Sequence, residues 1–242
     1  MKALLTILLV QVLFVFCAVQ AQEIVEERAA VPGFHERLLP GTARRYTLVI
    51  PRGYTGEEAV PLIVSLHYGG SVTPFYGRGL LEALIEPVLR ELGAIFVAPD
   101  SAAGEWTNAQ AEEHVLELLE HVTEVYNVDV SRTLLTGYSM GGKGTWYLAA
   151  RHQDRFKAAL PIAGLPEADS GVTDWRIPIY VIHGALDRVI PLEPSRAVVD
   201  QLKSRGMPIE FIVLDDVGHY EIPAYREHLA AAIPWVIAAW GK

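Results

Sequence analysis

TLLTGYSMGGKGTWYLAARH, residues 133–152, joins a β-rich run to a helix-forming segment with hardly a linker. Ser139 stands at the junction, between Gly137 and Gly141. A strand that turns at once into a helix brings backbones too close for Cβ atoms, which explains the two glycines, and it exposes the hydroxyl of the central serine. The helix start offers free N–H groups with partial positive charge, so the Met140 amide is well placed to donate to an oxyanion. The stretch predicts an exposed, reactive serine.

Short apolar runs alternate with segments of helical periodicity along the rest of the chain. Strands are predicted at 45–51, 61–66, 94–98, 133–136, 158–163, 179–182 and 209–214, and helices at 80–92, 109–126, 142–152, 193–205 and 224–239. Pro87 and Pro234 are expected to interrupt their helices. Nearly continuous apolar strands separated by helices indicate an α/β fold, with a mostly parallel sheet covered by helices on both faces. The short segment 164–177 leaves no room for a cap domain over this sheet.

The chain has 242 residues, a net charge of −9 and a sequence pI near 5.4. It lacks the basic surface that nucleic acids or anionic membranes attract, so no such partner is expected. This length fits one α/β domain with a sizeable core. We assign residues 22–44 to an N-terminal lead-in and residues 45–242 to a single catalytic domain.

Residues 1–21 have the pattern of a cleavable signal peptide. Lys2 precedes an apolar run over residues 4–19, and residues 19–21 (VQA) offer small side chains at the two positions that a signal peptidase reads. The run is shorter than the roughly 20 residues of a spanning helix. We therefore expect cleavage, secretion or export to the periplasm, and no stable membrane insertion afterwards. Cys17, the only cysteine, lies in this segment, so the mature protein has no disulfide and no thiol nucleophile.

A serine hydroxyl needs a base, and the base needs a group that orients it. His219 follows the last predicted strand and precedes the last helix, which puts it at the same edge of the sheet as Ser139. The acid is expected at another strand end, where Asp187 lies. Asp174 precedes its strand, at the wrong edge, and the pair 215–216 (DD) is too close to His219 in sequence to be preferred.

The other histidines have structural interpretations. His67 and His183 lie at strand ends and are predicted to hold loops, and His152 to cap a helix end. His114 and His121 lie on a helix with an acidic face, so we expect them at the surface. The glutamates of that helix are predicted to form a solvated face, and no metal site or cofactor is expected.

The segments GYSMGG (137–142), HGALDRVIP (183–191) and DDVGHY (215–220) resemble the α/β-hydrolase superfamily. Within it, they are similar to small serine esterases of the carboxylesterase, phospholipase and polyhydroxybutyrate-depolymerase-like group, which is related to prolyl-oligopeptidase catalytic domains. The resemblance covers residues of about 45–240 and implies the α/β-hydrolase fold. It also implies the order Ser139, Asp187, His219 for the catalytic residues.

The resemblance further implies that the loop after the second predicted strand, HYGG (67–70), supplies an oxyanion-hole amide. By this alignment the second N–H comes from Gly69, although Tyr68 in place of a glycine leaves both residues as candidates. Trp106 and Tyr220 are candidates for lining the substrate pocket, and a loop-anchoring role for Trp106 is an equal alternative.

The implied activity is hydrolysis of carboxylic esters, small or polymeric, through an acyl-serine intermediate. One alternative is a serine peptidase of the prolyl-oligopeptidase type, but the segment before the first predicted strand is too short for the propeller that such enzymes add. Dienelactone-hydrolase-like chemistry expects a cysteine nucleophile, where this chain has Ser139. A non-catalytic binding protein of the same fold is the third alternative. The oligomeric state cannot be derived from the sequence.

Overall fold

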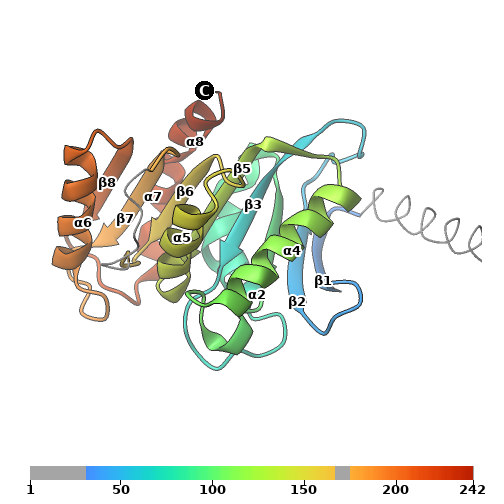
Figure 1. The fold of residues 1–242 in the computed structure, drawn as a ribbon, viewed down its shortest axis with the longest axis horizontal. Helices are drawn as coiled ribbons and strands as arrows, with labels where there is room; N and C mark the ends of the chain where they lie inside the picture. The colour runs from blue at the N-terminus through green and yellow to red at the C-terminus, as the bar shows by residue number, and fades with distance from the viewer. Residues whose placement is uncertain (1–30, 167–174, 242) are drawn as a thin grey trace, which may run out of the picture.

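The computed structural model describes residues 31–166 and 175–241. Within these ranges the strands form one 8-stranded sheet in the order β1-β2-β4-β3-β5-β6-β7-β8 (Figure 1). The strands are β1 (Gly33–Leu38), β2 (Arg45–Ile50), β3 (Val60–Leu66), β4 (Ile95–Pro99), β5 (Val128–Tyr138), β6 (Ala158–Ile162), β7 (Ile179–Gly184) and β8 (Ile209–Leu214). β1 and β2 pair antiparallel to each other, and β2 is antiparallel to β4, whereas the other neighbours are parallel. The predicted mostly parallel α/β sheet is confirmed.

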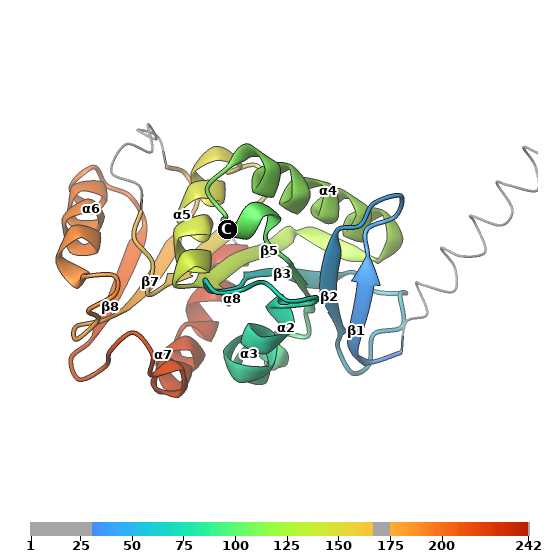
Figure 2. The same ribbon diagram turned by 90° about the horizontal axis from the view of Figure 1, so that it is seen from below.

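Helices cover both faces of the sheet (Figure 2). The helical segments are α2 (Gly77–Leu80), η1 (Leu81–Ile85), α3 (Glu86–Leu89), η2 (Arg90–Leu92), η3 (Ala102–Gly104), α4 (Ala109–Val125), α5 (Met140–Arg151), α6 (Leu192–Ser204), η4 (Ile222–Ala224), α7 (Tyr225–Ala231) and α8 (Ile233–Trp240). The core on one face joins side chains of α4, α5 and α6 to the sheet, and the core on the other joins those of α2, α3, α7 and α8. Because the sheet is buried on both faces, its ligand-accessible positions lie at the carboxyl ends of the parallel strands.

Proline shapes two of the helices as predicted. The helical segment 77–92 contains a π-helical turn, η1, directly before the short helix α3 that holds Pro87. The C-terminal helix is divided into α7 and α8, and Pro234 lies in the first turn of α8. Proline lacks the N–H that would continue the ladder of the preceding turn, which accounts for both interruptions.

Two features differ from the sequence prediction. β1 lies in the segment assigned to the lead-in, where no strand was predicted, and it extends the sheet at its edge. His114 of α4 was expected at the surface, but it is buried with 3% of its area exposed. Burial, followed by the nearby charge of Arg44, lowers the pKa of His114 to about 4.

The signal peptide predicted at residues 1–21 lies outside the described residues. In the described part of the chain, no helix has the length and apolarity required to cross a membrane.

Candidate active site

Ser139 occupies a strained turn at the carboxyl end of β5. Its backbone has φ 58° and ψ −115°, a conformation that residues other than glycine rarely adopt. Helix α5 begins at the next residue, Met140. The Ser139 amide donates to the carbonyl of Ile162 at 2.9 Å, which ties the turn to β6. A Cβ atom on Gly141 would collide with the carbonyl oxygen of Leu66 in β3. The glycine is therefore required by close backbone packing, as the sequence predicts.

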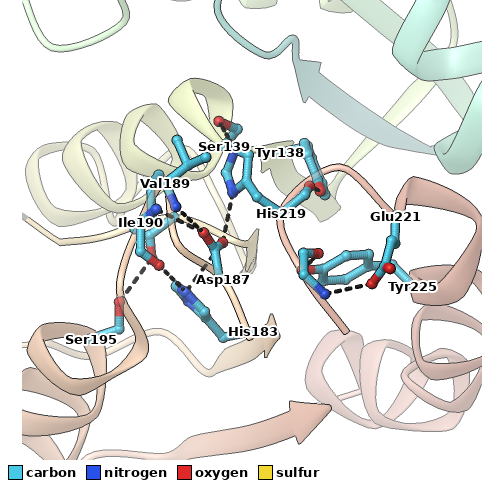
Figure 3. Close-up of polar contacts among 12 residues, drawn as sticks. Tyr138, Ser139, His183, Asp187, Val189, Ile190, Ser195, His219, Glu221 and Tyr225 are labelled. Atoms are coloured by element: carbon cyan, nitrogen blue, oxygen red, sulfur yellow. Dashed lines mark hydrogen bonds and ion pairs between the residues drawn. The ribbon is translucent and has the colours of Figure 1, made fainter. Parts of the chain in front are cut away.

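The structure brings Ser139, His219 and Asp187 into one hydrogen-bonded chain (Figure 3). The Oγ atom of Ser139 lies 2.8 Å from Nε2 of His219, and Nδ1 of His219 lies 2.6 Å from Oδ2 of Asp187. The three residues follow β5, β8 and β7, so their proximity results from the strand order of the sheet. The geometry leaves one imidazole nitrogen facing the hydroxyl and the other facing the carboxylate, which is the arrangement that a general base requires.

The carboxylate of Asp187 is held rigidly. Its Oδ1 atom accepts hydrogen bonds from the amides of Val189 at 2.9 Å and Ile190 at 2.7 Å. The Asp187 side chain is also fully buried, with 0% of its surface exposed. With Oδ1 occupied by the two amides, Oδ2 is the oxygen that remains for His219.

A second histidine lies against the same carboxylate. Nε2 of His183 is 3.6 Å from Oδ2 of Asp187 and hydrogen-bonds to the carbonyl of Ile190 at 2.8 Å. Burial lowers the pKa of His183. A neutral His183 that donates to Ile190 fixes the loop whose amides hold Asp187, and it supports the prediction that His183 holds a loop.

Two tyrosines and a glutamate hold the loop that carries His219. The Tyr138 hydroxyl donates to the carbonyl of His219, and the Tyr225 hydroxyl donates to the carbonyl of Gly218 at 3.2 Å. The Gly218 amide donates to Glu221 at 2.6 Å. Burial is the main cause that raises the pKa of Tyr138, and burial together with the charge of Asp187 raises that of Tyr225 to about 12. Both hydroxyls therefore remain donors at neutral pH. Sequence reasoning missed these contacts because the partners are far apart in the chain.

The HYGG loop (67–70) lies on the β3 side of Ser139. A Cβ atom on Gly69 would lie 3.8 Å from both Cβ and Sδ of Met140, so Gly69 faces the first residue of α5. The Tyr68 ring packs on Tyr76 at 5.6 Å, edge to face. Gly69 and Met140, two of the candidates for oxyanion contacts, thus lie next to each other, and the choice between Gly69 and Tyr68 stays a prediction.

The buried imidazole of His67 holds this loop through hydrogen bonds to backbone atoms. Nε2 of His67 accepts a hydrogen bond from the Ser101 amide at 3.0 Å, and Nδ1 contacts the Tyr68 carbonyl at 2.7 Å. Burial lowers the pKa of His67 to about 4, so the imidazole is neutral and acts as both acceptor and donor. Beyond the HYGG loop, in the segment that leads to α2, the Phe75 amide donates to Asp100 at 2.9 Å.

The two candidate pocket residues have different positions. Trp106 is fully buried, and its indole N–H donates to the carbonyl of His67 at 2.9 Å. Trp106 therefore anchors the HYGG loop, and its lack of exposed surface favours this alternative over a place in the substrate pocket. Tyr220 is 81% exposed, and its ring centroid lies 5.2 Å from that of His219. It remains a candidate for substrate contact.

The acidic face of α4 is engaged in ion pairs and hydrogen bonds. Arg44 contacts both Glu113 and Glu117, and Glu112 lies 2.7 Å from His152 and 3.0 Å from the Tyr147 hydroxyl. Among the residues that the structure describes, no group of three or more acidic, histidine or cysteine side chains is arranged to hold a metal ion.

Comparison with known proteins places the chain in a family. The model of the dienelactone hydrolase family matches residues 99–231, which include Ser139, Asp187 and His219. The chain belongs to the dienelactone hydrolase family. This family is part of the α/β-hydrolase superfamily, so the predicted superfamily and fold are confirmed. We expected a cysteine at this position for dienelactone-hydrolase-like chemistry, and this member of the family carries Ser139 there.

Relatives of this family member include fungal esterases. "Probable feruloyl esterase C" of Aspergillus terreus is 33% identical over 164 residues, a match that covers 62% of this chain and 57% of the relative. "Feruloyl esterase C" of Emericella nidulans gives the same identity and coverage. The match thus spans little more than half the length of these relatives. A solved structure described as a thermostable esterase superposes with a TM-score of 0.69 at 24% identity, over 85% of this chain and 62% of the other, and it supports the fold.

Proposed function

We propose that the protein is a serine hydrolase that cleaves carboxylic esters, with Ser139 as nucleophile, His219 as general base and acid, and Asp187 as the orienting carboxylate. The observation that carries this proposal is the hydrogen-bonded chain from Ser139 Oγ through the imidazole of His219 to Asp187, with distances of 2.8 Å and 2.6 Å. Membership of a hydrolase family and relatives named as feruloyl esterases agree with it.

The proposed reaction has two steps. His219 Nε2 takes the proton of the Ser139 hydroxyl as Oγ attacks the ester carbonyl carbon, and the amides of Gly69 and Met140 donate to the resulting oxyanion. The C–O bond to the alcohol then breaks, and the alkoxy oxygen leaves with the proton held by His219. Water attacks the acyl-Ser139 ester with His219 again as base, which releases the acid and restores Ser139. Asp187 keeps Nδ1 protonated throughout and stabilises the imidazolium.

This chemistry requires no metal or organic cofactor. The names of the relatives direct the choice of substrate to ferulate esters, as small molecules or attached to a polymer. We also propose that residues 1–21 direct the protein to the cell exterior or periplasm, that residues 22–44 form an N-terminal lead-in whose strand β1 joins the sheet, and that residues 45–242 are the catalytic domain.

A single experiment tests the proposed activity. Purified protein is incubated with p-nitrophenyl acetate, with methyl ferulate and with prolyl and alanyl p-nitroanilides. Two variants are assayed beside it, Ser139→Ala and the control Ser204→Ala, an exposed residue at the end of α6. We expect ester hydrolysis, lost in Ser139→Ala and unchanged in Ser204→Ala. Hydrolysis of the anilides alone would instead favour the peptidase. Failure of a fluorophosphonate probe to label wild-type protein, without turnover of any substrate, would favour a binding protein.

A further inference from the structure

Three apolar side chains extend into solvent beside His219 and Asp187. Leu186 is 57% exposed, Val189 50% and Tyr220 81%. Leu186 precedes Asp187, Val189 follows it by two positions, and Tyr220 follows His219. We refer to Leu186, Val189 and Tyr220 as the apolar rim. A single exposed apolar residue is ordinary, but several gathered around one reactive group indicate a binding surface.

The loops that carry the apolar rim are joined to each other. The Leu186 amide donates to the carbonyl of Val217 at 3.0 Å, and the Ala185 amide donates to that of Leu214 at 2.8 Å. The Tyr220 ring is perpendicular to the imidazole of His219, with an interplanar angle of 88°. Figure 3 shows Val189 at the same end of the hydrogen-bonded cluster as Ser139. Backbone hydrogen bonds therefore join the two loops that carry the rim, on the side of His219.

The strand order separates the two sides of the nucleophile. β5, which ends at Tyr138 directly before Ser139, lies between β3 on one side and β6, β7 and β8 on the other. The loop after β3 carries Gly69, the candidate oxyanion contact. The loops after β7 and β8 carry Asp187, His219 and the apolar rim. An ester bound to Ser139 thus meets the oxyanion contacts on one side and the rim on the other.

The direction of the proton transfer indicates that the alcohol half of the ester lies on the side of the rim. When the tetrahedral intermediate collapses, the electron pair of the breaking C–O bond moves to the alkoxy oxygen, and this oxygen takes the proton from Nε2 of His219. The alkoxy oxygen must then lie within hydrogen-bond reach of Nε2, so the alcohol projects toward the β7–β8 side. The rim is the surface that the alcohol meets there.

We propose that Leu186, Val189 and Tyr220 form the alcohol-binding subsite, and that the preferred substrates are esters of bulky alcohols that contain a ring with an apolar face. The inference rests on the proposed esterase function. The flat face of Tyr220 can pack against such a ring, and the aliphatic side chains widen the apolar contact. Because the rim is open to solvent, an alcohol that is itself attached to a larger molecule also fits.

The test uses methyl and benzyl butyrate, which share the acyl group and differ in the alcohol. Wild-type protein, Tyr220→Ala, Tyr220→Phe and the control Ile237→Ala, an exposed apolar residue of α8, are compared. We expect wild-type kcat/KM to be higher for the benzyl ester. In Tyr220→Ala the benzyl-to-methyl ratio is expected to fall about five- to tenfold. Tyr220→Phe and Ile237→Ala should keep the wild-type ratio.

A second readout separates alcohol binding from a general structural effect. Once the alcohol has left, both esters give the same butyryl-Ser139 enzyme. The contact between Tyr220 and the alcohol is made only before this step. The deacylation rate of Tyr220→Ala in single-turnover experiments should therefore stay within about twofold of the wild-type rate. An unchanged benzyl-to-methyl ratio would overturn the proposal. So would slower deacylation, or a change in preference among methyl esters of acids of different length. Absence of any ester hydrolysis or fluorophosphonate labelling in the wild type would instead refute the proposed function on which the inference rests.

Discussion

The hydroxyl of Tyr138 donates a hydrogen bond to the backbone carbonyl of His219, so the residue before Ser139 holds the residue that contacts Ser139. The Tyr138 ring also packs edge to face on Tyr225, with centroids 5.3 Å apart. Tyr225 in turn donates to the carbonyl of Gly218. The imidazole is therefore positioned from two elements, the end of β5 and the start of α7, in addition to its contact with Asp187.

Removing this hydroxyl should impair the chemical step. We expect Tyr138→Phe to lower kcat about fivefold, because the loss of one buried hydrogen bond of roughly 1 kcal/mol allows the His219 backbone to shift. KM should change less than twofold. Burial raises the pKa of Tyr138, so the donor stays protonated at neutral pH and the defect should not vary there. Steady-state kinetics and the rate of fluorophosphonate labelling measure the effect. Labelling at the wild-type rate would mean that the bond serves loop stability alone.

Asp187→Asn should cause a much larger loss. The amides of Val189 and Ile190 will select the oxygen of the new side chain, which turns its NH₂ group toward His219. Nδ1 of the imidazole must then be an acceptor, so Nε2 carries the proton and cannot take one from Ser139. We expect kcat/KM to fall by about 10³- to 10⁴-fold.

The matched control for this carboxylate is Asp216→Asn, an exposed aspartate that also precedes His219. It should keep nearly full activity with the same ester and leave the unfolding transition in place. Equal losses in the two variants would contradict the assignment of Asp187.

The fold could be predicted because it depends on local patterns. Buried strands are near-continuous apolar runs, and the spacing of apolar residues in α4 is strongly helical. β1 was missed because it is an edge strand with mixed burial, GFHERL, whose pairing with β2 determines its conformation. The burial of His114 did have a signal, since it lies three residues after Ala111 and four before Leu118, on the apolar face of α4.

The site was predictable to the extent that it depends on strand ends. Ser139, Asp187 and His219 each follow a parallel strand, and parallel strands carry their ends to one edge. The role of Trp106 could not be derived in the same way, because a side chain in a loop after a strand can point either into the pocket or into the core. The contact of its indole with the carbonyl of His67 depends on how two loops pack, and no local pattern encodes it.

Stability should fall in mildly acidic solution. His67 and His114 have pKa values lowered from 6.5 to about 4, mainly by burial, so the unfolded chain binds protons that the folded chain does not. The free energy of unfolding therefore decreases as pH falls from 6.5 toward 4, by a few kcal/mol for the two groups together. Urea denaturation at pH 7 and pH 5 measures this slope. We expect His114→Asn to flatten it, and an unchanged slope would show that His114 is not buried as a neutral group.

The close contact between α5 and β3 should make Gly141 intolerant of any side chain. In Gly141→Ala the added methyl group would collide with the backbone carbonyl of Leu66, which cannot move without disturbing β3 and the HYGG loop that follows it. We expect a loss of about 2–4 kcal/mol in the free energy of unfolding, as for other overpacked core positions. Gly241→Ala is the control, because its methyl group would lie 3.7 Å from the nearest atom, an ordinary contact. Thermal unfolding of the two variants distinguishes them, and equal stability would mean that the turn at Ser139 can relax.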